Sequence, residues 1–345
     1  MMARRYLFAA LIALMLVAPA LAGGQPATPA LALPPSQPST GPGGADYLFA
    51  DVSARHYGPE PDGSTVPDGY WLFEPASPLP NVRVGAVPLI FFFHGYYGTD
   101  PSHYRAWIDH LVRRGTVVLY PDYQPLEESL LSKCPNVCSE ADRPTLPHAL
   151  AAIRAGLAEL ESGEHVPVDL TNVGATGHSW GAMLSAKYTA IAESEGLPVP
   201  SAIMPAMPGC VCDFAGEVGT VPAETRVIML VGRQDVLVRD QFARLMWNAM
   251  DQVPLENRDF VRLTIDSHGG PPLIADHGTP ATEGVRGPLD AYDWYGTWKF
   301  FDMILSCSFA DVGCESALGN TPEQRFMGVW SDGTPVVDAE ITDQP

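Results

Sequence analysis

The chain has 345 residues, of which 46% are hydrophobic and 17% are charged, and its formal net charge is −20. The apolar content excludes a disordered protein, which would be too polar to bury a core. The acidic excess, 40 Asp and Glu against 20 Lys and Arg, argues against nucleic acid and anionic lipid as the main partner, because both bind basic surface.

The first residues have the layout of an export signal. Two arginines precede an apolar run over residues 6–17, and small residues then offer a cleavage site before Gly23. An N-terminal membrane anchor is the alternative, although the run is shorter than the ~20 residues that a span needs. We therefore predict a signal peptide over 1–22, a secreted or periplasmic protein, and no stable membrane span after cleavage.

Residues 23–45 hold six prolines together with Gly, Ser, Thr and Ala. Such a segment buries too little apolar surface to offset its ordering entropy, so we predict a flexible linker. The folded part then runs over 46–345 as one domain, with residues 306–345 as a C-terminal extension. We expect a monomer.

From residue 46 onward, strand-like apolar runs alternate with segments of helical periodicity. In chain order we predict strands at 47–53, 69–73 and 87–93, a helix at 103–113, a strand at 116–120, a helix at 146–160, a strand at 170–176, a helix at 182–194, strands at 202–207 and 226–231, a helix at 241–250, a strand at 260–265 and a helix at 291–305. This alternation predicts an α/β fold with a mostly parallel sheet. Active sites of such sheets form at the carboxyl ends of the strands.

Six cysteines follow the export segment, and an even number in an exported chain favours disulfides. They are Cys134, Cys138, Cys210, Cys212, Cys307 and Cys314. The close spacings predict local disulfides between Cys134 and Cys138 and between Cys307 and Cys314, although six cysteines allow 15 pairings. A zinc site is the alternative, but no His lies near these pairs at ligand spacing. We therefore predict no metal.

A nucleophile motif, Gly177-His178-Ser179-Trp180-Gly181, lies between a predicted strand and a predicted helix. A Ser on a sharp strand-to-helix turn presents its hydroxyl above the sheet edge, and the turn is tight enough to require Gly at 177 and 181. A glycine-rich turn with an incidental Ser is the alternative interpretation.

A serine nucleophile needs a histidine base that a carboxylate orients. Asp235 follows the strand at 226–231, on the same sheet edge as Ser179, and a helix N-cap is its alternative role. His268 directly follows the strand at 260–265 and is the first candidate for the base. His277, in the same loop, is the alternative.

The oxyanion of an acyl-transfer intermediate needs two preorganised donors. The backbone N–H groups of Trp180, after the nucleophile, and of Tyr96, after the third strand, are the candidates. Gly95 lets that second loop turn inward, and Tyr97 and His178 are further candidates for the substrate pocket.

Together, His94-Gly95-Tyr96 after a strand, the Ser179 motif, Gly232-x-x-Asp235 and a late His resemble the α/β-hydrolase superfamily. Within it, the chain is most similar to the branch of dienelactone hydrolases, platelet-activating-factor acetylhydrolases and cutinase-like polyester hydrolases. The resemblance covers roughly residues 46–306. It implies a three-layer α/β/α sandwich with an eight-stranded sheet, a Ser-Asp-His triad, and ester hydrolysis without a metal or organic cofactor.

The sequence therefore predicts a secreted serine esterase whose partner is a small, lipid or polymeric ester. A non-catalytic binding protein of the same fold is one alternative. A peptidase or amidase with the same triad is the other, although the chain leaves little room for the gating domain that such an enzyme needs.

Overall fold

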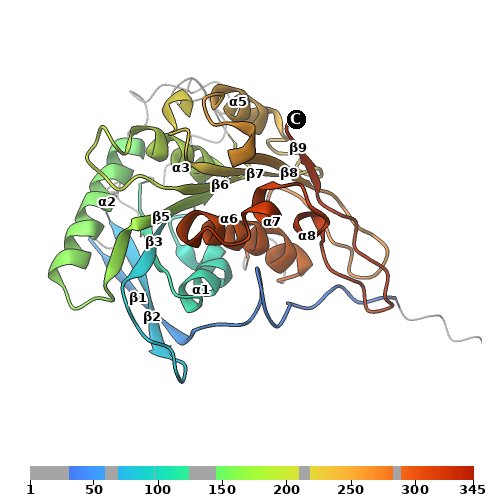
Figure 1. Cartoon of the computed structure of the whole chain (residues 1–345), viewed down its shortest axis with the longest axis horizontal. Helices are drawn as coiled ribbons and strands as arrows, with labels where there is room; N and C mark the ends of the chain where they lie inside the picture. Colours follow the sequence, from blue (N-terminus) through green and yellow to red (C-terminus); the bar gives the residue numbers. More distant parts are fainter. Residues whose placement is uncertain (1–30, 59–68, 97, 124–144, 210–217, 283–288) are drawn as a thin grey trace, which may run out of the picture. The chain divides into compact units, whose positions relative to one another are not determined.

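The computed structural model of the protein describes residues 31–58, 69–96, 98–123, 145–209, 218–282 and 289–345. Within these residues, nine strands form one sheet in the order β1-β2-β4-β3-β5-β6-β7-β8-β9 (Figure 1). The strands are β1 (Phe49–Tyr57), β2 (Tyr70–Pro78), β3 (Val87–Phe93), β4 (Val117–Pro121), β5 (Val168–His178), β6 (Ala202–Ala206), β7 (Arg226–Gly232), β8 (Arg258–Leu263) and β9 (Glu340–Thr342).

The sheet is parallel in its centre and antiparallel at both edges. Strands β4, β3, β5, β6, β7 and β8 pair in parallel, whereas β1 and β2 at one edge and β9 at the other pair antiparallel. The fold is thus α/β with a large, mostly parallel sheet, as the alternation of strands and helices predicts.

Helices cover both faces of the sheet. They are α1 (Arg105–Arg113), α2 (Thr145–Ser162), α3 (Trp180–Ile191), α5 (Gln241–Ala249), α6 (Lys299–Ala310), α7 (Cys314–Leu318) and α8 (Pro322–Arg325). Short turns of 3-10 helix lie at Pro101–Tyr104, Val218–Thr220 and Leu255–Asn257, and a π-helical turn, Asp293–Trp298, leads into α6. Apolar side chains of α2, α3 and α5 pack in one core, and those of α1 and α6 in another.

Strand β3 shows why the central strands lie inside. Leu89, Ile90, Phe91, Phe92 and Phe93 are all fully buried. Alternate side chains enter the two cores, with Phe91 and Phe93 on the α3 side and Ile90 and Phe92 on the α1 side. Each such burial stabilises the fold by about 2 kcal/mol, so a continuous apolar run suits a strand that is covered on both faces.

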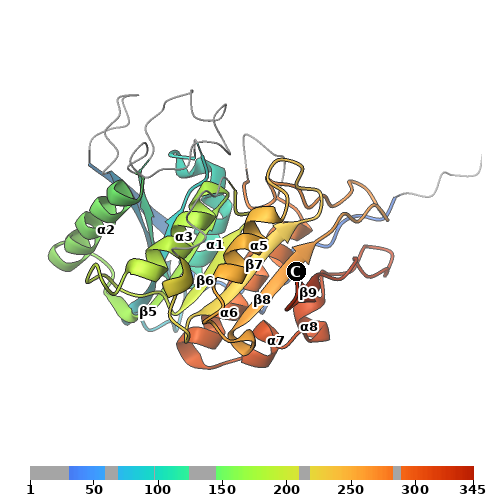
Figure 2. The same cartoon turned by 90° about the horizontal axis from the view of Figure 1, so that it is seen from above.

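The described residues form a sheet of nine strands, so the expectation of an eight-stranded sheet is wrong. β9 belongs to the C-terminal extension, pairs with β8 and forms the edge of the sheet (Figure 2). Three residues carry too short a pattern for a sequence-based prediction. Its pairing partner is β8, with Val261 opposite Ile341, so β9 can form only after β8 has folded.

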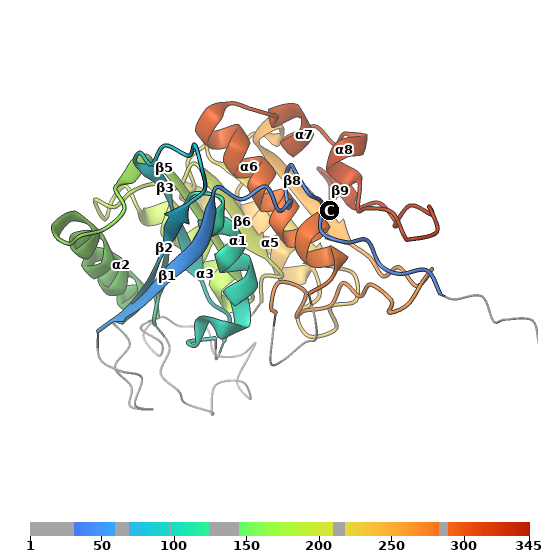
Figure 3. The same cartoon turned by 90° about the horizontal axis from the view of Figure 1, so that it is seen from below.

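Residues 32–45, which we name the strap, correct the prediction of a flexible linker for that part of the chain. The strap runs along the α6 side of the sheet (Figure 3). Pro35 C=O accepts a hydrogen bond from Trp294 Nε1 at 3.2 Å, and Gly43 N–H donates to the buried Asp302 carboxylate at 2.7 Å. Prolines reduce the entropy that an extended segment loses on ordering, and these partners lie 259 residues away in the sequence.

The C-terminal extension packs on the same side of the molecule as the strap. Trp330 is buried, and its Nε1 donates to Asp266 at 3.2 Å. Lys299 Nζ donates to the carbonyls of Gln324 at 2.7 Å and Phe326 at 2.6 Å, and burial lowers the pKa of this lysine to about 7. The extension is therefore part of the folded unit.

One predicted disulfide is confirmed, between Cys307 of α6 and Cys314 of α7. The other four cysteines, Cys134, Cys138, Cys210 and Cys212, lie outside the described residues, as does the predicted signal peptide. Among the described residues, no helix is both long and apolar enough to cross a membrane.

Candidate active site

The turn from β5 into α3 holds Ser179 in an unusual backbone conformation. Its φ is 56° and its ψ is −116°, a region that costs a non-glycine residue about 1–3 kcal/mol. The hydrogen bond from Ser179 N–H to Ala206 C=O at 3.0 Å holds the turn against the end of β6. Strain of this kind is typical of nucleophiles on a strand-to-helix turn.

The two glycines of the motif are required by close backbone approach. A Cβ at Gly181 would lie 2.1 Å from Phe93 O, and one at Gly177 would lie 2.4 Å from Gly181 O. Ordinary Cβ contacts are never this short. The turn therefore packs directly on the end of β3, as the motif predicts.

Three side chains from three loops form a hydrogen-bonded series at the carboxyl edge of the sheet, and we name Ser179, His277 and Asp235 the triad. His277 Nε2 lies 2.9 Å from Ser179 Oγ, and His277 Nδ1 lies 2.7 Å from Asp235 Oδ2. With the aspartate ionised, Nδ1 carries the proton and Nε2 can accept the proton of the serine hydroxyl.

The Asp235 carboxylate is held ionised despite its burial. Burial would raise its pKa, but hydrogen bonds from His277 and from the N–H groups of Val238 and Leu237 outweigh that effect and leave the pKa below its usual value. The two backbone bonds reach Oδ1 at 3.0 and 2.9 Å. Oδ2 is thus left to His277, and Asp235 does not cap α5, whose N-cap is Asp240.

The order of the two histidine candidates is reversed by the structure. His268 is partly exposed and its Nε2 lies 2.7 Å from Asp332 of the C-terminal extension. Asp266 and Leu273 form an antiparallel bridge with two hydrogen bonds of 2.9 Å, which closes a small outward loop around His268. The chain returns to the sheet only after this bridge, and therefore His277 reaches Ser179.

A glycine at the end of β7 admits the returning chain. A Cβ at Gly232 would lie 2.3 Å from Ala275 O, and Gln234 N–H donates to the same carbonyl at 3.0 Å. The glycine at this strand end is the local sequence feature that indicates close packing of the later part of the loop against β7.

Three tyrosines hydrogen-bond to described residues of the loop after β3, and we name residues 94–96 and 98 the β3 loop. Tyr104 Oη accepts from Gly95 N–H at 3.0 Å, Tyr123 Oη donates to His94 C=O at 2.5 Å, and Tyr120 Oη donates to Gly98 C=O. Burial lowers the pKa of His94 to about 4, and its ring stacks on Tyr123 at 4.0 Å. His94, Gly95 and Gly98 are therefore held in place by neighbouring side chains.

The residues predicted to line the substrate pocket have different placements. Gly95 and His178 are buried and take part in interior hydrogen bonds, His178 with Tyr104 and with His277 C=O. Tyr97 lies outside the described residues. Sequence reasoning missed Tyr104, which lies in no motif and is recognised only by its contacts.

Gly209, which follows β6, lies close to the Ser179 hydroxyl. A Cβ at Gly209 would lie 3.2 Å from Ser179 Oγ and 2.6 Å from Val238 Cγ1. Any side chain at this position would crowd the serine hydroxyl. Gly209 therefore avoids contacts that a larger residue would make with Ser179 and Val238.

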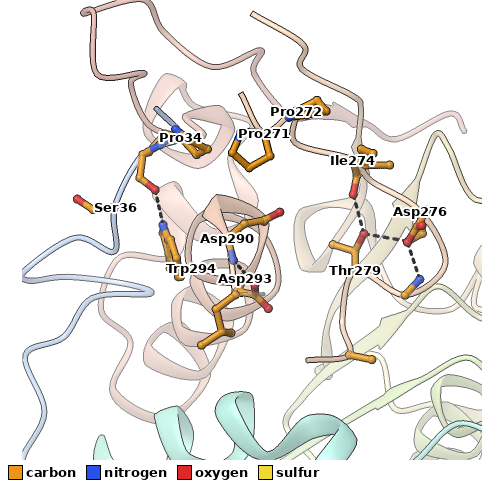
Figure 4. A pocket seen from close by; sticks show the side chains of 14 residues that line it. Pro34, Ser36, Pro271, Pro272, Ile274, Asp276, Thr279, Asp290, Asp293 and Trp294 are labelled. Carbon is orange, nitrogen blue, oxygen red and sulfur yellow. Dashed lines mark hydrogen bonds between the residues drawn. The ribbon is translucent and has the colours of Figure 1, made fainter. Parts of the chain in front are cut away.

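A cavity of about 460 Å³ lies beside the loop that carries the triad histidine (Figure 4). Its walls come from residues 34–36 of the strap, 271–281 and 289–294. Burial raises the pKa of Asp290, and that of Asp293 well above its usual value. Ser179 is not among the residues that line this cavity.

Among the described residues, no group of His, Cys, Asp and Glu side chains is arranged to hold a metal ion. Comparison of the chain with protein-family models and with curated proteins gave no match. The assignment of a function therefore depends on the geometry of the site.

Proposed function

We propose that the chain is a serine hydrolase of the α/β-hydrolase superfamily that cleaves carboxylic esters through an acyl-enzyme intermediate. The observation that carries the proposal is the hydrogen-bonded series from Ser179 Oγ to His277 at 2.9 Å and from His277 to Asp235 at 2.7 Å. A strained turn that presents the serine and an ionised, buried aspartate support it further.

In the proposed reaction, His277 Nε2 removes the proton of Ser179 as Oγ attacks the ester carbonyl. A tetrahedral oxyanion forms, and its collapse expels the alcohol, which takes the proton back from His277. A water molecule then attacks the acyl-enzyme with His277 as base again, and the carboxylic acid is released. Asp235 stabilises the imidazolium that forms in each step.

The oxyanion would be held by the backbone N–H groups of Trp180 and Tyr96. Trp180 is the first residue of α3, where the helix dipole favours negative charge. Gly95 N–H donates to Tyr104 Oη, and the position after the third strand assigns Tyr96 as the donor of the β3 loop. Removing one such donor usually costs about 3 kcal/mol in transition-state stabilisation.

The nucleophile is tested with a fluorophosphonate probe and p-nitrophenyl esters. The probe should label the protein at one serine, and Ser179→Ala should abolish both labelling and ester cleavage. Ser194→Ala, which removes an exposed hydroxyl after α3, is the matched control and should leave both unchanged. Labelling that survives Ser179→Ala would refute the assignment.

The base is tested by a pair of variants. We expect His277→Ala to lower kcat by about 10⁴-fold or more, because His277 is the base that lies within hydrogen-bonding distance of Ser179 Oγ. His268→Ala should change kcat by less than about threefold, since its partner Asp332 lies in the C-terminal extension. The reverse order would assign the base to His268.

We also propose that the protein is exported, to the periplasm or the medium. The apolar segment at 6–17 and the disulfide between Cys307 and Cys314 support this location, because disulfides persist in oxidising compartments. N-terminal sequencing of the protein recovered from its native compartment should begin at Gly23. A mature protein that retains Met1 would contradict cleavage.

A further inference from the structure

Three hydrogen bonds connect the β3 loop to the loop of the triad histidine through the protein interior. Gly95 N lies 3.0 Å from Tyr104 Oη, Tyr104 Oη lies 2.9 Å from His178 Nδ1, and His178 Nε2 lies 2.6 Å from His277 O. His178 is also the residue directly before Ser179 in the chain. The series therefore touches three of the segments on which the proposed reaction depends.

For a neutral His178, one arrangement of protons satisfies the donors and acceptors of this series. His277 C=O can only accept, so His178 Nε2 carries the hydrogen and donates it. In neutral His178, Nδ1 is then an acceptor, and the Tyr104 hydroxyl donates to it. The Tyr104 oxygen still has a lone pair, which accepts from Gly95 N–H. Every polar group of the series is thus satisfied.

The series is shielded from water. Tyr104 is 3% exposed, His178 is 7% exposed and His277 is 6% exposed. A buried polar group that loses its partner keeps the full desolvation penalty, which is about 1–3 kcal/mol. Removing the Tyr104 hydroxyl would leave both Gly95 N–H and His178 Nδ1 without that partner, so the two loops would relax to find others.

The side chains around the series leave little freedom for a different arrangement. A Cβ at Gly95 would lie 2.9 Å from Tyr104 Oη and 3.2 Å from His178 Nδ1. The rings of His178 and His277 lie 4.8 Å apart between centroids. A movement of the Tyr104 or His178 side chain is therefore transmitted to the backbone of both loops.

We propose that Tyr104 and His178 are positioning residues, which hold the oxyanion donor of the β3 loop and the imidazole of His277 in the correct positions relative to Ser179. This inference rests on the proposed serine hydrolase function. Neither residue reacts with the substrate. Their effect is on the geometry of the groups that do, and a misplacement of about 1 Å can lower a rate by about 10²-fold.

The test compares Tyr104→Phe with a matched loss of one buried tyrosine hydroxyl elsewhere. Tyr188 of α3 is fully buried and its Oη donates to Pro198 C=O at 2.9 Å, so Tyr188→Phe removes a similar hydrogen bond away from both loops. We expect similar decreases in Tm for the two variants. Only Tyr104→Phe should lower kcat, by about 10- to 100-fold, with KM changed less than about threefold.

A second pair of variants acts at His178 and keeps the test decisive if Tyr104→Phe does not fold. His178→Gln retains an N–H donor for His277 C=O, whereas His178→Leu retains none. We expect kcat to be lower than wild type in both and lower in the leucine variant. Equal activity of both variants and wild type would overturn the inference.

The rate of fluorophosphonate labelling separates failure of this inference from failure of the proposed function. Labelling needs the activated nucleophile and the oxyanion donors but no deacylation, so it should slow by the same factor as kcat in Tyr104→Phe. If the wild-type protein is not labelled at Ser179, the proposed function fails. If it is labelled and Tyr104→Phe is labelled as fast, only the positioning role is refuted.

Discussion

Gly181→Ala tests whether the turn of the nucleophile and the end of β3 form one rigid unit. The new Cβ would lie 2.1 Å from Phe93 O and 2.5 Å from His94 O, both backbone atoms. Real Cβ contacts are essentially never below 3.0 Å, so the turn and β3 must separate by roughly 1 Å. Overpacking of this kind costs about 1–3 kcal/mol, and we expect the upper part of that range because no flexible side chain can yield.

The same displacement should reach the active site, because His94 begins the β3 loop and Ser179 lies two residues from the substitution. We expect a decrease of about 10²-fold in kcat/KM and a lower free energy of unfolding, measured by urea denaturation. The protein should still fold, since domains have about 5–15 kcal/mol of stability. Gly85→Ala is the control, because a Cβ at Gly85 would meet no atom within 4 Å. A Gly181→Ala protein within about 0.5 kcal/mol and threefold of wild type would refute the reasoning.

Three further predictions address other parts of the molecule. Asp235→Asn should lower kcat by about 10³- to 10⁴-fold in ester hydrolysis with little change in folding, because an amide no longer fixes the tautomer of the triad imidazole; a loss below tenfold would contradict this. Burial raises the pKa of Asp259 to about 6. The buried carboxyl group is therefore neutral at low pH, and the protein loses stability as the pH rises through 6 and this group becomes charged. Asp259→Asn keeps an acceptor for Gln324 Nε2 and should stabilise the protein by about 2–3 kcal/mol at pH 8 but not at pH 4, whereas an equal difference at both pH values in urea denaturation would exclude this cause. Replacing both Cys307 and Cys314 by Ala should lower the free energy of unfolding by about 2–3 kcal/mol, as expected for a short closed loop, and an unchanged urea midpoint would show that the disulfide contributes nothing.

The sequence by itself determined the α/β alternation and the position of the tight turn at Ser179. Apolar runs such as 87–93 must lie inside, and the same residues form β3 in the structure. The glycines at 177 and 181 mark a turn too tight for a side chain, which the backbone contacts bear out. These features are local, because periodicity and steric limits depend on neighbouring residues in the chain.

Only the tertiary structure shows which of the two histidines lies next to Ser179. His268 lies closer in sequence to the end of β8, but the bridge between Asp266 and Leu273 sends it outward to Asp332 and brings His277 to the sheet edge. Loop paths depend on partners far away in the chain, which no local pattern contains.

The same reason applies to the strap, to β9 and to Tyr104. The strap looks like a linker in composition, yet its hydrogen-bond partners include Trp294 and Asp302. Strand β9 forms only on the edge that β8 provides, and Tyr104 is connected to His178 across 74 residues of sequence. In each case, the stabilising contact exists only after the chain has folded, and therefore the amino-acid pattern alone cannot reveal it.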